Sequence, residues 1–409
     1  MTQNALAPTW IKYGTREYRR TGVAFFLAGF ATFSLLYCVQ PLLPLFAAEF
    51  DVSPAQSSLA LSLATGGLAF SVAAAGALSQ GIGRRGLMFA AMTIAALLQI
   101  VASLAPDWRL LLAARALEGF VLGGLPAVAM AYLAEEIEPG HLGKSMGLYV
   151  AGTAFGGMMG RVGMGVFTEW VPWRFALALF ALCCVAAAVG FRMLLPPSRN
   201  FVRRPGLDIS FHLQAFRAHF ANTALLRIYA SAFLSMSVFV TLYNYMTFRL
   251  TEAPYLLSQT AISMIFLIYA FGVLSSSLGG VLSDKFGGRP LLIYSYIFMF
   301  VGVITTLAHS LALIIAGLVI MTVAFFIAHA VGSGSIGPLA DKAKAHASAL
   351  YLLFYYLGSS VSGTTGGWFW EHGGWTAVAA FAGAACIAGL LIALSARARP
   401  TGQAAPIDA

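Results

Sequence analysis

Charged residues are scarce in this chain of 409 residues. Asp, Glu, Lys and Arg together make up 10% of it, whereas 59% of the residues are hydrophobic. A typical soluble domain carries about 25% charged residues. The mean hydropathy is +0.82, so there is too little charge for water to solvate most of the outer surface. We infer that lipid covers that surface, which excludes an ordinary soluble domain.

Cysteines are few, and none stands where a disulfide or a zinc site needs one. All four lie inside apolar runs: Cys38, Cys183, Cys184 and Cys386. We interpret them as small hydrophobic residues. The first 20 residues are polar and basic, with Lys12, Arg16, Arg19 and Arg20. A cleavable signal peptide is therefore not predicted.

Several catalytic signatures are missing from the sequence. There is no Walker A phosphate loop, which argues against direct use of ATP, and no His-Glu-x-x-His or Gly-x-Ser-x-Gly motif. We therefore expect no enzymatic activity, no cofactor and no metal. The formal net charge is +9, but the basic residues are spread over short loops between apolar runs. This distribution favours membrane topology over nucleic-acid binding.

Long apolar runs fill the sequence instead. A single membrane crossing needs about 20 such residues, and twelve runs qualify as transmembrane helices. They lie near residues 22–46, 57–79, 87–105, 110–134, 146–168, 175–195, 226–248, 260–283, 291–308, 311–337, 348–370 and 376–396. The longest polar connection follows the sixth run. We predict an N-terminal segment 1–21, a six-helix bundle 22–195, a central loop 196–225, a second bundle 226–396 and a tail 397–409.

The distribution of Lys and Arg predicts an orientation for these spans. If the N-terminus is cytoplasmic, most basic residues fall on the cytoplasmic side, and only Arg109, Arg174 and Arg249 fall on the other. Cytoplasmic loops carry the excess of Lys and Arg in membrane proteins. We therefore expect both termini, the central loop and the tail to be cytoplasmic.

The two halves of the chain repeat one another. The segment YVAGTAFGGMMG (149–160) matches YYLGSSVSGTTG (355–366) at an offset of 206, and LLYCVQ in the first run matches TLYNYM in the seventh. After the second run, GALSQGIGRR (76–85) parallels GVLSDKFGGR (280–289) at an offset of 204. Matches in the same order at a nearly constant offset predict two equivalent halves of six helices each.

Two six-helix repeats with these loop motifs resemble the major facilitator superfamily over essentially the whole chain. The resemblance is strongest to bacterial proton-coupled drug and sugar efflux permeases. It implies an all-α integral membrane fold of 12 transmembrane helices in two pseudo-symmetric six-helix bundles. It also implies a substrate site between the bundles, alternating access and action as a monomer. A channel would not need two repeated halves with matching loops.

The repeated loops resemble the gating motif of that family. The first copy has Gly76, Gly83, Arg84 and Arg85, but Gln80 replaces the usual acid; the second has Gly280, Asp284, Lys285, Gly287 and Arg289. The resemblance implies a cytoplasmic latch between helix ends. A neutral amide at Gln80 makes a weaker bond than a carboxylate. A plain positive-inside loop would explain Arg84 and Arg85 alone.

Glycines recur every four residues in the fifth run and share one helix face. They are Gly152, Gly156 and Gly160, and the eleventh run has Gly358 and Gly366 at matching positions. Small residues at this spacing let membrane helices approach closely. The same face permits sliding, and exporters of the family carry a similar glycine-rich fifth helix, although their Gly-Pro pair is absent here.

Three charged residues fall within the apolar runs and away from their ends. Arg115 and Glu118, three residues apart, share a helix face in the fourth run, and Arg161 lies at similar depth in the fifth. We consider two hypotheses for this set. In one, Arg115, Glu118 and Arg161 form a structural ion network; in the other, Glu118 gains and loses a proton during transport, because ionisable groups inside membranes are usually functional.

The resemblance implies that spans one, four, seven and ten line the central cavity. Its candidate substrate residues are Tyr37, Gln40, Tyr243, Asn244 and His329. The tyrosines have the alternative role of membrane anchors, and His329 that of a structural histidine bonded to a carbonyl. We predict a bacterial inner-membrane transporter that exports a drug or small metabolite in exchange for protons. The alternative is a proton-coupled importer of a small organic anion.

Overall fold

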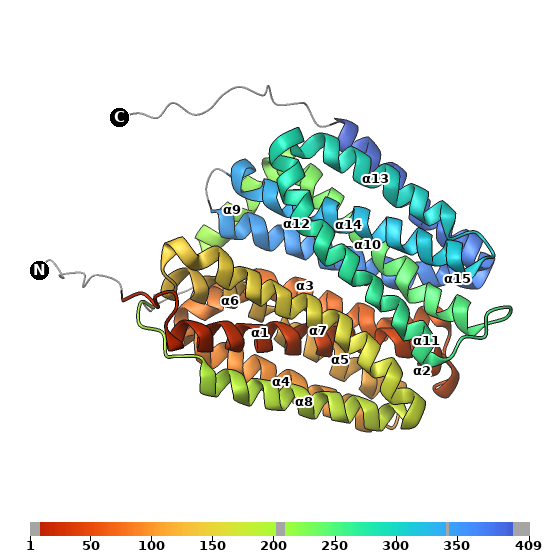
Figure 1. The fold of residues 1–409 in the computed structure, drawn as a ribbon, viewed down its shortest axis with the longest axis horizontal. Helices are drawn as coiled ribbons and strands as arrows, with labels where there is room; N and C mark the ends of the chain where they lie inside the picture. Colours follow the sequence, from red (N-terminus) through yellow and green to blue (C-terminus); the bar gives the residue numbers. More distant parts are fainter. Residues whose placement is uncertain (1–8, 202–208, 341–342, 396–409) are drawn as a thin grey trace, which may run out of the picture.

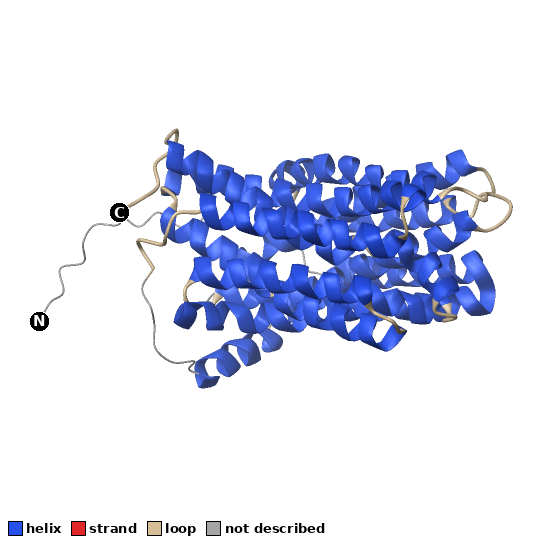
Figure 2. Cartoon of the chain, turned by 90° about the horizontal axis from the view of Figure 1, so that it is seen from below, coloured by secondary structure: helices blue, strands red, loops and turns tan. Residues whose placement is uncertain are grey.

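The computed structural model is a bundle of long helices that run in nearly the same direction (Figure 2). It describes residues 9–201, 209–340 and 343–395, with the side chains of residues 73–82, 209, 211 and 212 excepted. Among these residues the only β-type contact is a single bridge between Ile11 and Ile137. The fold is therefore all-α, as the sequence predicts.

Helices α1 to α8 form the first bundle, which we call the N half (Figure 1). They are α1 (Arg16–Tyr37), α2 (Leu43–Glu49), α3 (Pro54–Ile82), α4 (Arg84–Leu104), α5 (Trp108–Leu122), α6 (Gly124–Glu136), α7 (Leu142–Trp170) and α8 (Trp173–Leu194). Two short 3₁₀ turns, η1 (Gln40–Leu42) and η2 (Pro139–His141), lie between them.

Helices α10 to α15 form the second bundle, the C half, and α9 lies in the connection between the halves. The elements are α9 (Ile209–Ala221), α10 (Thr223–Thr251), α11 (Gln259–Met264), η3 (Ile265–Ile268), α12 (Tyr269–Phe286), α13 (Gly288–Thr305), α14 (Leu311–Leu339) and α15 (Lys344–Ser395). Non-helical Gly373 and Gly374 divide α15 into two arms.

The bundle has two ends, the terminal face and the far face. The terminal face contains the start of α1, the ends of α8 and α15, and α9 (Figure 1). The far face contains α2 and the start of α11. In the described part of the chain, nine helical runs are long and apolar enough to cross a membrane. The count of twelve spans stays a prediction.

Three of the predicted spans are interrupted where continuous helices were expected: the first, the fourth and the eighth, in which η3 lies between α11 and α12. The first span stops at Tyr37 and resumes as α2, with Pro41 in the interruption and Pro44 in the first turn of α2. Proline lacks the N–H that would bond the carbonyl four residues back. The fourth span breaks at Gly123 between α5 and α6, three residues before Pro126. The first two breaks leave backbone groups of the N half open to other partners.

The glycine face of α7 packs directly against the backbone of α1. A Cβ at Gly152 would lie 2.4 Å from the carbonyl oxygen of Phe26, and one at Gly156 2.3 Å from that of Phe30. The C half repeats the contact, because a Cβ at Gly358 would lie 2.3 Å from the carbonyl oxygen of Phe233 in α10. Close helix approach is thus one role of these glycines.

Candidate functional site

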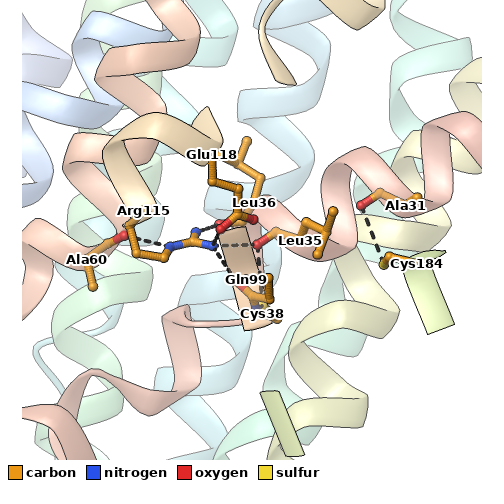
Figure 3. A network of polar contacts seen from close by, with 9 residues as sticks. All are labelled: Ala31, Leu35, Leu36, Cys38, Ala60, Gln99, Arg115, Glu118 and Cys184. Carbon is orange, nitrogen blue, oxygen red and sulfur yellow. Dashed lines mark hydrogen bonds and ion pairs between the residues drawn. The ribbon is translucent and has the colours of Figure 1, made fainter. Parts of the chain in front are cut away.

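The guanidinium of Arg115 is fully buried in the N half and holds three helices together (Figure 3). Its Nε donates to the carbonyl oxygen of Ala60 in α3 at 3.1 Å. Its Nη1 and Nη2 donate to the carbonyl oxygens of Leu35 at 3.0 Å and Leu36 at 2.7 Å. These carbonyls accept no backbone N–H from a following helical turn because α1 ends at Tyr37, and a cation is favourable at a helix C-terminus.

Arg115 also binds two polar side chains in the same pocket. Its Nη1 lies 2.7 Å from Oε2 of Glu118, which is itself fully buried, and 2.9 Å from Oε1 of Gln99 in α4. The Nε2 of Gln99 in turn contacts the sulfur of Cys38 at 2.9 Å. The other carboxylate oxygen of Glu118, Oε1, is buried and has no hydrogen-bond partner. One acceptor in the network is therefore unused.

Arg161 lies apart from this pair and faces the C half. Its Nε donates to Oε1 of Gln40. Its Nη1 donates to the carbonyl oxygen of Gly157. The guanidinium carbon lies 4.0 Å from the ring centroid of Tyr37, 4.7 Å from that of Tyr269 and 5.4 Å from that of Phe266. Within the described chain no carboxylate lies within 4.0 Å of Arg161. The structure brings Arg115 and Glu118 together but does not bring Arg161 to them.

Four of the five predicted substrate residues gather around Arg161. Gln40 bridges the halves, because its Nε2 donates to Oδ1 of Asn244 at 2.7 Å. The ring of Tyr243 lies 4.8 Å from that of Tyr269, and its hydroxyl is 2.8 Å from Oγ1 of Thr322. Tyr37, Gln40, Tyr243 and Asn244 are all buried. We call this set, with Arg161, Phe266 and Tyr269, the Arg161 cluster.

His329 lies elsewhere in the C half, within a group of tyrosines. Its Nδ1 is 3.0 Å from the hydroxyl of Tyr351, and its ring centroid is 4.6 Å from that of Tyr355. The Tyr351 hydroxyl also donates to the carbonyl oxygen of His329 at 3.2 Å. His329 thus has partners of its own and forms no hydrogen bond or ring contact with the Arg161 cluster.

The predicted gating loops occupy equivalent places in the two halves. Gly83 and Gly287 have positive φ angles of 96° and 84°, a conformation that favours glycine, and each precedes a helix start. Arg85 donates to the carbonyl oxygen of Arg192 at the end of α8 at 2.6 Å. Arg289 donates to that of Leu394 at the end of α15 at 2.8 Å. Each loop therefore ties two helix ends of its own half.

The remaining loop residues differ between the copies. Arg84 forms an ion pair with Glu135 at the end of α6. Lys285 lies over the ring of Phe286, and Asp284 and Gly280 are exposed on the terminal face. The side chains of Gly76 and Gln80 lie outside the described residues. The role of these loops as a latch stays a prediction.

The halves also meet through residues that the sequence analysis missed. Glu169 at the end of α7 accepts hydrogen bonds from the backbone N–H and the hydroxyl of Thr260 at 3.1 and 2.7 Å. Glu371 in α15 accepts from the backbone N–H of Ala55 at 3.0 Å. Ser360 donates to the carbonyl oxygen of Ser62 at 2.7 Å. In the described chain, the hydrogen bonds between the halves lie between mid-bundle and the far face.

Glycine environments show the same difference between the two ends. A Cβ at Gly165, near the far face, would lie 1.6 Å from Oγ of Ser263 across the interface, and one at Gly367 2.3 Å from Cα of Ala55. Toward the terminal face, a Cβ at Gly143, Gly147 or Gly334 would meet no atom within 4 Å. The halves are tightly packed at the far face.

Known proteins match this chain along its length. The Major Facilitator Superfamily matches residues 25–274 and 229–409. The inner membrane transport protein YnfM of Escherichia coli is 42% identical over 94% of this chain and 92% of its own length. The MFS-type transporter YybF of Bacillus subtilis, described as uncharacterised, is 40% identical over 90% and 91%. The solved nucleoside transporter NupG has the same fold, with a TM-score of 0.77 at 12% identity, over 92% of this chain and 99% of its own.

The chain belongs to the major facilitator superfamily. It is therefore a multi-pass membrane transporter of small molecules and not an enzyme. The resemblance to the superfamily, inferred from the six-helix repeats and the loop motifs, is confirmed.

Proposed function

We propose that this protein is a proton-coupled secondary transporter in which Glu118 carries the proton. One observation supports this role above others. Glu118 is buried beside a single cation, and its Oε1 has no hydrogen-bond partner, so that oxygen is free to take a proton. Intramembrane carboxylates are costly and usually functional.

The contacts of Arg115 supply a route from protonation to the interface between the halves. Arg115 binds both Glu118 and the carbonyl of Leu36 at the end of α1. Four residues further, Gln40 contacts Arg161 and, in the other half, Asn244. Neutralising Glu118 removes the charge that balances Arg115, and we propose that the end of α1 then shifts with its inter-half bonds.

The proposed cycle is alternating access by one subunit in the bacterial inner membrane. The basic residues near the terminal face, among them Arg85, Arg192 and Arg289, support placing that face in the cytoplasm. Hydrogen bonds and tight glycine contacts join the halves near the far face. This arrangement supports a state closed to the outside.

For the direction of transport, we propose export of a drug or small metabolite in exchange for protons. The glycine face of α7, which packs on α1, supports it through the likeness to exporters. Import of a small organic anion with protons is the second candidate. Arg161, buried without a carboxylate partner, favours an anion.

The test is proton movement in proteoliposomes that carry a pH gradient, with a panel of drugs, sugars and organic anions. Wild type is compared with Glu118→Gln, which keeps an acceptor for Arg115 but cannot ionise. Glu252→Gln, which removes an exposed carboxylate at the far face, is the matched control.

We expect a transported compound to dissipate the pH gradient in wild type and in the control Glu252→Gln. In Glu118→Gln the same compound should leave the gradient intact. Proton flow opposite to the compound identifies export by antiport, and flow in the same direction identifies import. If Glu118→Gln couples normally, the Arg115–Glu118 pair is structural, and the proton site is elsewhere, with His329 to be tested first.

A further inference from the structure

Away from the helix ends, the buried charges of the described spans do not sum to zero. Arg115 and Glu118 neutralise one another at 2.7 Å. Arg161 is 2% exposed, and its guanidinium contacts an amide, a backbone carbonyl and three aromatic rings, all uncharged. Cation–π contacts and neutral acceptors offset part of the cost of burying this charge. One positive charge remains uncompensated at the interface between the halves.

Hydrogen-bond donors are also in excess around this charge. Asn244 is fully buried, and its Nδ2 has no partner while its Oδ1 is occupied by Gln40. The hydroxyl of Tyr269, whose ring lies 4.7 Å from the guanidinium, has no partner either. Buried donors without acceptors are unfavourable, and a ligand rich in acceptor oxygens would relieve that cost.

We propose that the Arg161 cluster binds the anionic oxygen group, a carboxylate or a phosphate, of the transported molecule. This inference rests on the proposed transport function but not on proton coupling or on direction. Arg161 supplies the charge and a planar pair of donors that suits such groups. Tyr37, Phe266 and Tyr269 supply an apolar wall for the rest of the molecule.

The experiment measures binding by thermal stabilisation of the purified protein in nanodiscs at one pH, so no proton gradient is involved. The anionic probes are benzoate, gluconate and glycerol 3-phosphate, and the neutral counterparts are benzamide, glucitol and glycerol. The variants are Arg161→Gln and Arg161→Lys. Arg109→Gln, which removes the same charge from an exposed position, is the control.

We expect at least one anion to stabilise wild type and Arg109→Gln, while its neutral counterpart does not. Its affinity should fall about 10-fold or more in Arg161→Gln, the effect of losing a charge-assisted bond of at least about 1.4 kcal/mol, and less in Arg161→Lys. Binding should persist in Glu118→Gln even if proton coupling is lost there. Equal stabilisation by the neutral counterparts, unchanged binding in Arg161→Gln or no response of wild type to any anion would overturn the inference.

A second inference rests on a different observation, the pair of acid contacts at the far face. Glu169, at the end of α7, accepts from the backbone N–H of Thr260 at the start of the helical run Gln259–Phe286, of which α11 is the first part. Glu371, in α15, accepts from the backbone N–H of Ala55 at the start of α3. Each half thus places an acid against the N-terminus of a helix in the other half, where negative charge is favourable.

The residues that form this contact recur in the same pattern in both halves of the sequence. GVFTE (165–169) and GWFWE (367–371) both read Gly-x-x-x-Glu, so the glycine and the acid lie one turn apart on the same helix face. Gly165 lies against Ser263, and Gly367 lies against Ala55. The glycine allows the close approach that brings the acid within reach of the N-terminus.

We infer that these two acid contacts, which we call the far-face caps, hold the far face closed and must both break when it opens. Because Glu169 and Glu371 are exposed, salt should screen the charge part of each contact. A cap that is easily broken suits a gate that opens in every cycle.

The test follows the accessibility of one reporter, Ser263→Cys, to a membrane-impermeant maleimide in nanodiscs. Ser263 is fully buried against Gly165, and the background carries Cys183→Ala because Cys183 is the exposed native cysteine. Glu371→Gln, Glu169→Gln and the double variant are compared with Glu252→Gln, which removes an exposed far-face acid.

We expect each single variant to raise the labelling rate about two- to five-fold, the effect of losing one charge at a helix terminus, and the double variant to raise it further. Glu371→Gln is the decisive variant, because its cap lies at the other contact, and only movement of the halves as rigid bodies carries its loss to Ser263. High salt should raise labelling in wild type but not in the double variant. No change in Glu371→Gln, or an equal rise in Glu252→Gln, would refute the caps.

Discussion

The two halves share a fold but differ in how their cores are held. The N half buries Arg115, Glu118 and Arg161 in its fourth and fifth spans. The matching α14 of the C half has no Asp, Glu, Lys or Arg between Leu311 and Leu339. Its polar contacts are neutral, such as Tyr243 with Thr322 and Tyr351 with His329.

This difference follows from the broken first span. In the N half, α1 ends at Tyr37 and leaves the carbonyls of Leu35 and Leu36 to be satisfied by Arg115. In the C half, α10 runs without interruption from Thr223 to Thr251, so its backbone bonds are internal. A charge is needed only where the helix end is exposed within the bundle. The N half is accordingly the half in which we place proton coupling.

The largest expected effect is loss of the Arg115 guanidinium. Arg115→Gln leaves Glu118 charged and unpaired and removes donors from three carbonyls, which should cost about 3–5 kcal/mol of unfolding free energy. The measurement is thermal or denaturant unfolding in detergent. The double variant Arg115→Gln with Glu118→Gln should recover part of that loss, since no buried charge remains. Equal stability of the single variant and wild type would contradict the charged-core account of the N half.

A smaller effect is expected from filling the α1–α7 contact. Gly156→Ala places a Cβ 2.3 Å from the carbonyl oxygen of Phe30, so the helices must separate, at about 1–3 kcal/mol. Gly147→Ala lies on the same helix with no atom within 4 Å of its Cβ and should be neutral or slightly stabilising. Unfolding midpoints of the two variants compare them directly. Equal unfolding midpoints for the two variants would contradict the tight packing of α7 on α1.

The neutral pair of the C half, Tyr243 and Thr322, should contribute less to the free energy of unfolding than the ion pair of Arg115 and Glu118. Tyr243→Phe leaves Oγ1 of Thr322 without its partner and should cost about 1–2 kcal/mol. A double-mutant cycle with Thr322→Val should give a coupling energy below that of the cycle for Arg115 and Glu118. If the two coupling energies are equal, the contrast between a charged and a neutral core has no energetic meaning.

The smallest effect on coupling is expected at His329. His329→Asn keeps a polar group beside Tyr351, and because His329 makes no contact with the Arg161 cluster or with Glu118, proton coupling in proteoliposomes should stay within about two-fold of wild type (a change below about 0.4 kcal/mol). Loss of coupling in this variant, with normal coupling in Glu118→Gln, would reverse the assignment of the proton site to the N half.

Local features of the site were predictable from the sequence. Arg115 and Glu118 are three residues apart on one helix, so their pairing needs only helical geometry. Gly152 and Gly156 predicted a close helix contact, but not that α1 is the partner. The break of the first span also had a signal, because Pro41 lies in it and Pro44 in the helical turn that follows.

Contacts between the halves were not predictable in the same way. Arg161, Phe266 and Tyr269 meet only because α7 packs against η3 and α12. The Gly-x-x-x-Glu repeat is offset by 202 residues, one helical turn less than the 206 of the earlier part of the same helices. A comparison at one fixed offset therefore hides it.

The sequence by itself determined that the chain is a helical membrane protein of two repeated halves in this superfamily, because apolar periodicity and repeated loops are local properties. The tertiary structure decided which charges are paired. Arg115 pairs with Glu118 and donates to the carbonyls at the end of α1. Arg161 contacts residues of the other half and has no carboxylate partner among the described residues. The reason is physical: a buried charge is stabilised by whatever groups packing brings within about 4 Å of it, and sequence spacing fixes those groups only within one helix.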